Sequence, residues 1–248
     1  MSAALETHGL MKRFGGLVVT NDVSLSIRTG ARHALIGPNG AGKTTIINLL
    51  TGALTPSGGR ILLNGEDITA ASPSGRVKRG LARTFQINQL FDDLTPLESV
   101  SMAVAERRGE GARMWRPLSR CREAVDEAAA LLERFRLADR MCLPTRSLPY
   151  GKQRLLEIAL ALALNPKVLL LDEPAAGVPE EDRHEVLGMV RALPDDVTVV
   201  LIEHDMDLVF SFADRISVLA AGRLFAEGTV DEISRDQQVR AIYLGDAA

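Results

Sequence analysis

The sequence has few cysteines, few aromatic side chains and no long apolar run. Only two of its 248 residues are cysteines, which excludes a secreted scaffold held together by disulfides. Aromatic residues make up 4%, and the longest strictly apolar run, Ile158 to Leu164, is far shorter than the ~20 residues that cross a bilayer. The opening segment MSAALETHGL lacks the basic and apolar regions of a secretory signal. We therefore expect a protein of the cytosol.

An excess of positive charge is also absent. The chain has 29 Lys and Arg against 32 Asp and Glu, a formal net charge of −3. A basic surface of the kind that binds nucleic acid is therefore not expected, and no nucleic-acid partner is predicted. Hydrophobic residues make up 46% and charged residues 25%, as in ordinary soluble proteins, and the length is sufficient for a sizeable core.

The hydrophobic pattern predicts an α/β fold with a parallel sheet. Apolar and polar residues alternate over 23–27, which is typical of a half-buried strand. The continuous apolar run 168–171 and the largely apolar segments 198–202 and 215–219 are typical of buried parallel strands, and helical patterns separate them. From about 88 to 165 the pattern is mostly helical.

A glycine-rich segment predicts a phosphate-binding loop. Residues 37–44, GPNGAGKT, fit the motif G-x-x-x-x-G-K-[ST] between a strand and a helix. Backbone N–H groups of such a loop surround phosphate oxygens, Lys43 reaches the β- and γ-phosphates, and the Thr44 hydroxyl holds Mg²⁺. The predicted nucleotide-binding residues are Gly37, Pro38, Asn39, Gly40, Ala41, Gly42, Lys43, Thr44 and Thr45.

Two acidic residues follow the apolar run 168–171. A carboxylate at the carboxyl end of a buried parallel strand lies where α/β sheets bind ligands. Asp172 is therefore predicted to hold Mg²⁺, and Glu173 to orient and deprotonate an attacking water.

The ordered motifs resemble those of the ATP-binding-cassette (ABC) family of transport ATPases over essentially the whole chain. They are the loop 37–45, Thr84-Phe85-Gln86, LPYGKQR at 148–154, LLLDEP at 169–174 and IEHD at 202–205. The resemblance implies a P-loop NTPase core with a parallel sheet, an antiparallel β subdomain and an inserted α-helical subdomain. Residues 1–87 and 166–248 would form the nucleotide-binding core, and 88–165 the helical subdomain with the signature motif.

The resemblance also implies roles for further residues. Gln86 would touch Mg²⁺ and the attacking water, His204 would contact the γ-phosphate, and Phe14 would stack on adenine. Across a dimer, ATP would be contacted by Leu148, Tyr150 and Gly151. Without the resemblance, each residue also has a structural explanation. Gln86 could be a polar residue at a strand end, His204 could form a structural hydrogen bond, and Phe14 could pack in the core. The remaining histidines, His8, His33 and His184, match no motif and are expected to be surface or packing residues.

The signature departs from the usual Leu-Ser-Gly-Gly-Gln. Pro149 replaces serine, Tyr150 replaces the first glycine and Lys152 replaces glutamine. Pro149 is suited to the first residue of the following helix. The segment 174–179 also lacks the aspartate common in the dimer-contacting loop. These departures favour a hetero-pair with two different nucleotide sites.

Four features resemble the larger ATPase subunit of branched-chain amino-acid importers: the segment 82–86, the long insert before the signature, 173–177 and the ending 242–245. This branch implies two transmembrane permease subunits, a second ATPase subunit (a copy or a sister ATPase) and an extracytoplasmic substrate-binding protein. The chain would lie at the cytoplasmic face of the inner membrane. Alternatives are a lipopolysaccharide exporter, a weakly hydrolytic regulatory subunit and a non-transport ABC protein. The arginine-rich segment 106–122 is either a solvated loop or a contact with lipid headgroups or membrane subunits.

Overall fold

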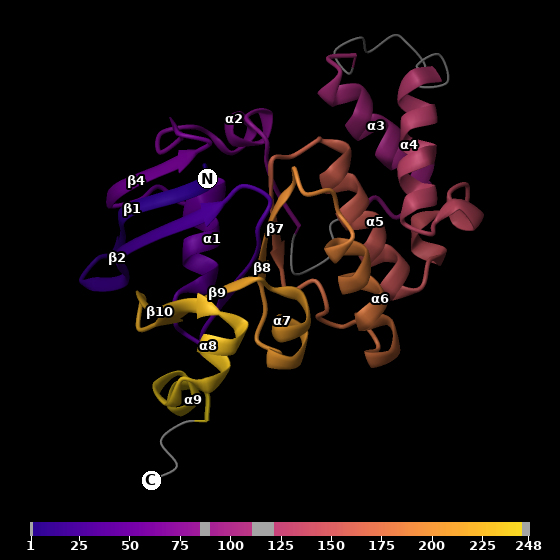
Figure 1. Cartoon of the computed structure of the whole chain (residues 1–248). Coiled ribbons are helices and arrows are strands. Elements are labelled where there is room, and N and C mark those ends of the chain that lie inside the picture. The colour runs from indigo at the N-terminus through magenta and orange to yellow at the C-terminus, as the bar shows by residue number, and fades with distance from the viewer. Residues whose placement is uncertain (1, 85–89, 111–121, 245–248) are drawn as a thin grey trace. The chain divides into compact units, whose positions relative to one another are not determined.

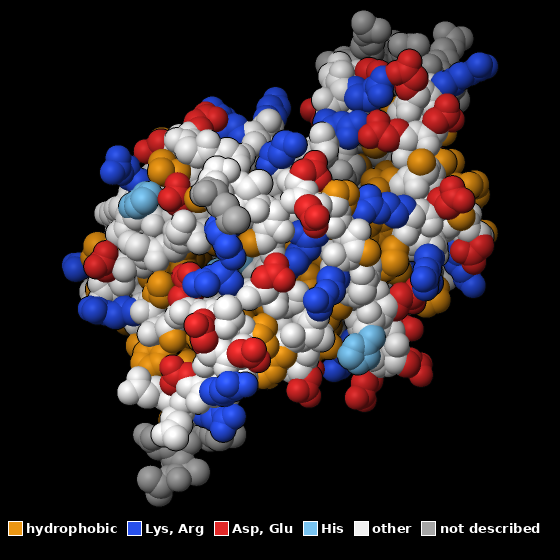
Figure 2. Space-filling view, in the orientation of Figure 1, with side chains coloured by type: hydrophobic (Ala, Val, Ile, Leu, Met, Phe, Trp, Pro, Cys, Tyr) orange, Lys and Arg blue, Asp and Glu red, His pale blue; other side chains and the backbone are white. Residues whose placement is uncertain are grey.

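The computed structural model describes residues 2–84, 90–110 and 122–244, and its chain divides into two compact units. Unit 1 comprises Met1–Arg83, Lys167–Glu173 and Leu193–Ala248, and unit 2 comprises Thr84–Pro166 and Pro174–Ala192. Figure 2 shows acidic and basic side chains mixed over the visible face, in keeping with the balanced composition.

Unit 1 contains a six-stranded sheet that is parallel apart from one edge strand. Its order is β10-β9-β3-β8-β7-β6, with β10 antiparallel to β9. The strands are β3 (Arg32–Ile36), β6 (Leu81–Arg83), β7 (Val168–Asp172), β8 (Thr198–Ile202), β9 (Arg215–Ala220) and β10 (Arg223–Thr229). Every residue of β3, β7 and β8 is buried, which explains the mostly apolar sequences of β7 and β8.

A second sheet of unit 1 is antiparallel, with the order β2-β1-β4-β5. Its strands are β1 (Ala3–Phe14), β2 (Leu17–Arg28), β4 (Gly58–Leu63) and β5 (Glu66–Asp67). The alternation predicted over 23–27 is confirmed, because Val23, Leu25 and Ile27 are buried while the serines between them are exposed. Figure 1 shows β1, β2 and β4 side by side.

The core of unit 1 joins the two sheets through the first helix. Leu10 from β1, Ile46 from α1 and Leu170 from β7 are fully buried members of one hydrophobic cluster. The helices of this unit are α1 (Lys43–Thr51), α2 (Pro73–Lys78), α7 (Met206–Phe212), α8 (Val230–Arg235) and α9 (Gln237–Leu244). This combination of parallel sheet, antiparallel sheet and helices confirms the predicted α/β class.

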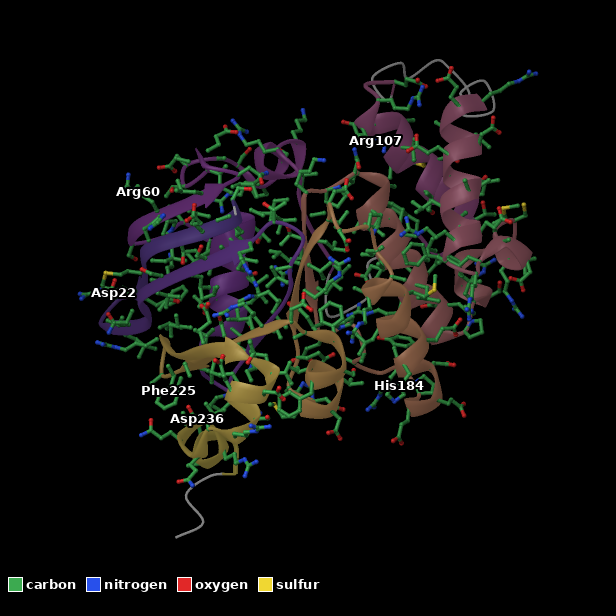
Figure 3. The ribbon with its side chains drawn as sticks, in the orientation of Figure 1. Asp22, Arg60, Arg107, His184, Phe225 and Asp236 are labelled. Atoms are coloured by element: carbon green, nitrogen blue, oxygen red, sulfur yellow. The ribbon has the colours of Figure 1, made fainter. Side chains whose placement is uncertain are left out.

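The described residues of unit 2 form helices joined by turns and irregular segments, with no strand. It contains α3 (Pro96–Arg107), α4 (Arg122–Arg134), α5 (Tyr150–Ala163), α6 (Glu180–Arg191) and two short 3₁₀ helices at Ala138–Arg140 and Thr145–Ser147. Arg107, labelled in Figure 3, donates to both carboxylate oxygens of Glu127 at 2.7 Å and so links α3 to α4. Most residues of α5 are buried, in keeping with the apolar run 158–164 that it contains.

Candidate functional site

The glycine-rich loop connects β3 to α1 in unit 1. Gly37 allows a close backbone approach, because a Cβ atom there would lie 2.4 Å from the carbonyl oxygen of Leu219. Gly42 has a left-handed φ of 100°, and a Cβ atom there would lie 3.0 Å from the carbonyl oxygen of Val19. Other residues would be strained or sterically excluded at these two positions.

The amino end of α1 is suited to an anion. Gly42 caps the helix without a side-chain hydrogen bond, and the first turn carries no acidic residue. Helix N-termini of this kind present backbone N–H groups and the positive end of the helix dipole to phosphate. Asn39, Gly40 and Thr44 are exposed, so this end of the loop is open to solvent.

Lys43 folds back onto the loop. Its Nζ atom donates to the carbonyl oxygens of Gly37 at 2.6 Å and Pro38 at 3.2 Å. Partial burial lowers the pKa of Lys43, while the carboxylates of Glu173 and Asp172 oppose that shift. The lysine is thus held close to the two predicted catalytic carboxylates.

Asp172 ends β7 and is paired with an arginine. Its Oδ2 atom accepts a hydrogen bond of 2.7 Å from Nη2 of Arg83, the last residue of the neighbouring β6. The two side chains are 9% and 14% exposed, so the pair is largely removed from solvent. Nη1 of Arg83 donates to Oδ1 of Asn48 on α1 at 2.7 Å. The sequence analysis missed Arg83, although it directly precedes the motif Thr84-Phe85-Gln86.

Glu173 and His204 follow adjacent strands and lie near each other. Because Asp172 of β7 pairs with Ile202 of β8, the residues after both strands emerge side by side. His204 Nδ1 is 3.6 Å from Glu173 Oε1 and 3.8 Å from Oε2 of the buried Glu203. Glu173 adopts a left-handed φ of 46°, which is uncommon for a residue with a side chain and is often found at functional sites.

Phe14 and Gln86 are the two remaining predicted residues of the nucleotide-binding core. Phe14, at the end of β1, is 46% exposed, and the Nζ atom of Lys12 lies 5.1 Å from its ring centroid. Gln86 lies outside the described residues, so its predicted position remains a prediction.

The signature segment lies in unit 2. Leu148 is buried and Tyr150 is 39% exposed. Pro149 was expected to be the first residue of the helix, but α5 begins at Tyr150 and Pro149 is its N-cap. Its carbonyl oxygen accepts from the N–H groups of Lys152 at 2.9 Å and Gln153 at 3.0 Å, and these bonds place it just outside the helix.

Two neighbours on α6 surround the start of α5. A Cβ atom at Gly151 would lie 3.0 Å from Oδ2 of Asp182, so the glycine allows these helices to approach closely. Lys152, which replaces the usual glutamine, lies 3.4 Å from Oε1 of Glu185.

The other histidines behave as expected. His8 and His184 are exposed, and Figure 3 labels His184 on α6. His33 is buried, with Nε2 at 2.8 Å from Ser217 Oγ. The described residues contain no cluster of three or more His, Cys, Asp or Glu side chains that could hold a metal ion. Among the helices of the described chain, none combines the length and apolar character needed to cross a membrane.

Comparison with known proteins identifies the family. The profile described as "ABC transporter" matches residues 20–176, and that described as "Branched-chain amino acid ATP-binding cassette transporter" matches residues 223–248. The chain is 39% identical to the high-affinity branched-chain amino acid transport ATP-binding protein BraF of Pseudomonas aeruginosa, with 98% of both chains covered. It is also 39% identical to the corresponding protein LivG of Escherichia coli K12, again with 98% of both covered.

Solved structures lead to the same family. A nucleotide-free ATP-binding cassette from an ABC transporter has a TM-score of 0.86 and 31% identity, covering 99% of this chain and 100% of the other. The ADP conformation of an ATP-binding cassette has a TM-score of 0.85 and 32% identity, with the same coverage. The resemblance read from the motifs is confirmed, and the chain belongs to the ABC transporter family.

Proposed function

We propose that this chain is an ATP-hydrolysing subunit that powers import of branched-chain or other hydrophobic amino acids, or related small molecules, through separate membrane subunits. The observation that carries the proposal is the grouping of Lys43, Asp172, Glu173 and His204 around the phosphate-binding loop of one unit. The near full-length likeness to ATP-binding proteins of branched-chain amino acid transport supports the choice of substrate class.

The residues of unit 1 fit Mg²⁺-ATP. The uncapped helix end at Gly42 and the ammonium group of Lys43 suit the triphosphate. Mg²⁺ favours oxygen ligands and takes only a few of them from protein when phosphates and water supply the rest. The Thr44 hydroxyl and the Asp172 carboxylate would be these protein ligands. When bound, Mg²⁺ would neutralise part of the negative charge of the phosphates. Gln86 is assigned a contact with the same cation and with the attacking water.

Hydrolysis requires an oriented water and a stabilised phosphate. Glu173 is assigned the role of accepting the proton of that water, and His204 contacts the γ-phosphate. Lys43 stabilises charge that builds on the phosphate oxygens. Phe14 supplies an exposed ring for stacking on adenine.

A second ATPase subunit completes each site. Leu148, Tyr150 and Gly151 would contact ATP bound by the partner, and the departures at Pro149 and Lys152 favour a sister ATPase over a second copy. The nucleotide-binding core is assigned to residues 1–87 and 166–248, and the helical subdomain to 88–165. Two permease subunits and an extracytoplasmic substrate-binding protein complete the importer, which places this chain at the cytoplasmic face of the membrane.

The test is Mg²⁺-ATP turnover as a function of protein concentration, for the chain alone and with its sister ATPase. Glu173→Gln is expected to retain ATP binding, to abolish turnover and to accumulate an ATP-bound dimer. Glu181→Gln, on the exposed first turn of α6, is the matched control and is expected to behave as wild type. Unchanged turnover in Glu173→Gln would remove Glu173 from the catalytic role. Tight ATP binding without turnover under every condition would favour a regulatory subunit.

A further inference from the structure

Arg83 connects the two elements that carry the nucleotide site. It ends β6 and pairs in register with Leu170 of β7, two residues before Asp172. Its guanidinium donates to Asp172 on β7 and to Asn48 on α1, both at 2.7 Å. One planar group therefore links the carboxylate to the helix that follows the phosphate loop.

Two positively charged side chains interact with Asp172, and the carboxylate of the adjacent Glu173 partly offsets them. Arg83 is 2.7 Å from the carboxylate, and the ammonium group of Lys43 interacts with both Asp172 and Glu173. A divalent cation that approaches Asp172 alone meets these positive charges at low solvent exposure, where Coulomb repulsion is poorly screened. A bound nucleoside triphosphate adds several negative charges and reverses this balance.

We propose that Arg83 is a positioning residue for Asp172, which it holds in a fixed orientation and shields from divalent cations until a nucleotide is bound. The proposal rests on the assignment of Asp172 to Mg²⁺ in the proposed function. It adds an order of binding, in which the cation enters together with the nucleotide.

A purely structural role for Arg83 makes a different prediction. In that case, removing the guanidinium would lower stability and leave the affinity of the empty site for cations unchanged. Under the proposal, the same change makes Asp172 available, so cation affinity without nucleotide rises. The guanidinium lies 2.7 Å from the carboxylate in a largely buried pair, so it repels a divalent cation that approaches the same oxygen atoms.

The experiment measures Mn²⁺ binding to the full chain without nucleotide, from the electron paramagnetic resonance signal of free Mn²⁺. Arg83→Met and Arg83→Gln are expected to bind Mn²⁺ at least about tenfold more tightly than wild type. Arg83→Lys keeps the charge and is expected to remain close to wild type. Arg79→Gln is the matched control, because Arg79 forms an exposed pair with Glu66 at 2.7 Å.

Further variants separate the proposal from the function on which it rests. In Arg83→Gln combined with Asp172→Asn, the additional Mn²⁺ binding is expected to disappear. If Asp172→Asn leaves the Mg²⁺ dependence of ATP hydrolysis unchanged, the assignment of Asp172 fails, and with it the proposed site. A different pair of results would overturn only the role of Arg83. In that case Asp172→Asn weakens Mn²⁺ binding in the presence of nucleotide, while folded Arg83→Met and Arg83→Gln bind Mn²⁺ without nucleotide as wild type does. Failure of both neutral variants to fold would assign Arg83 a structural role and overturn the proposal.

Discussion

The ring of Tyr150 lies against the Cα atom of Gly177. A Cβ atom at Gly177 would be 3.1 Å from Cε1 and 3.2 Å from Cζ and Oη of the ring, and the glycine has a left-handed φ of 73°. Arg154 on the same helix donates from Nε to the carbonyl oxygen of Pro174 at 3.0 Å. The start of α5 therefore holds the segment that follows Glu173 at two points, and one of them uses the tyrosine that replaces the usual glycine.

Replacement of Gly177 by alanine is expected to destabilise the protein by about 2 kcal/mol, because it combines an unfavourable backbone conformation with a contact to the Tyr150 ring. In a Tyr150→Ala background the loss of stability should fall to about 1 kcal/mol, because only the strain of the left-handed backbone remains. Urea denaturation measures both. Gly188→Ala is the control: no atom lies within 4 Å of a Cβ atom at this position inside α6. It should raise stability by about 0.5–1 kcal/mol, and equal losses at both glycines would contradict the argument.

Loss of the Lys43 ammonium group is expected to weaken ATP binding. A hydrogen bond to a charged group contributes about 1.5–3 kcal/mol, so Lys43→Ala should raise the dissociation constant for ATP roughly ten- to 150-fold. Isothermal titration calorimetry measures the change. Lys78→Ala, on the exposed end of α2, should bind ATP as wild type does. Equal affinities of Lys43→Ala and wild type would show that Lys43 does not reach the phosphates.

The free energy of unfolding is expected to decrease on acidification because of His33. Burial, assisted by Arg215 and Arg28 and opposed by Glu227, lowers the pKa of His33 to about 4. Between its ordinary pKa of about 6.5 and pH 4 the unfolded chain binds a proton that the folded chain does not, so stability decreases as pH falls through this window. The loss reaches about 3 kcal/mol near pH 4 and then levels off.

The variant His33→Gln tests this dependence, because glutamine can still bond to Ser217 without titrating. Urea denaturation at pH 7 and pH 4.5 should show a smaller loss of stability in the variant than in wild type. His8→Gln, at an exposed position, should keep the wild-type dependence. If wild type and His33→Gln lose the same stability on acidification, other groups carry the acid sensitivity.

Arg76 closes the carboxyl end of α1. Its guanidinium donates to the carbonyl oxygens of Leu49 at 2.5 Å and Leu50 at 2.6 Å, and also to those of Thr69 at 2.9 Å and Ala71 at 3.1 Å. Arg76→Met keeps the aliphatic stem and removes these four hydrogen bonds, which should cost about 3 kcal/mol or more in chemical denaturation. Arg79→Met is the control, because Arg79 is exposed and its loss should lower the free energy of unfolding by under about 1 kcal/mol. Similar losses in the two variants would show that burial at Arg76 contributes little.

Local sequence patterns predicted the strands and the phosphate loop well. The largely apolar segments 168–171, 198–202 and 215–219 correspond to β7, β8 and β9. The glycine-rich segment 37–44 connects β3 to α1 as expected, and the helix begins at Lys43. These features are local, since alternation, buried apolar runs and glycine-dependent turns follow from a few consecutive residues.

Pairings between distant residues were not predicted. Arg83 and Asp172 are 89 residues apart in sequence, and they meet because β6 and β7 are neighbours in the sheet. The stacking of Tyr150 on Gly177 likewise depends on how α5 packs against the segment after Glu173. No short pattern encodes which strands become neighbours or in which register they pair.

The sequence by itself thus determined the family and the α/β class, and it predicted the residues of the phosphate site, because these are encoded in contiguous motifs. Only the tertiary structure decided which side chains support them: Arg83 at Asp172, His204 beside Glu173 and the capping of α1 by Arg76. The physical reason is that hydrogen bonds and ion pairs act over a few ångströms in space. The arrangement of strands and helices brings the partners within that distance.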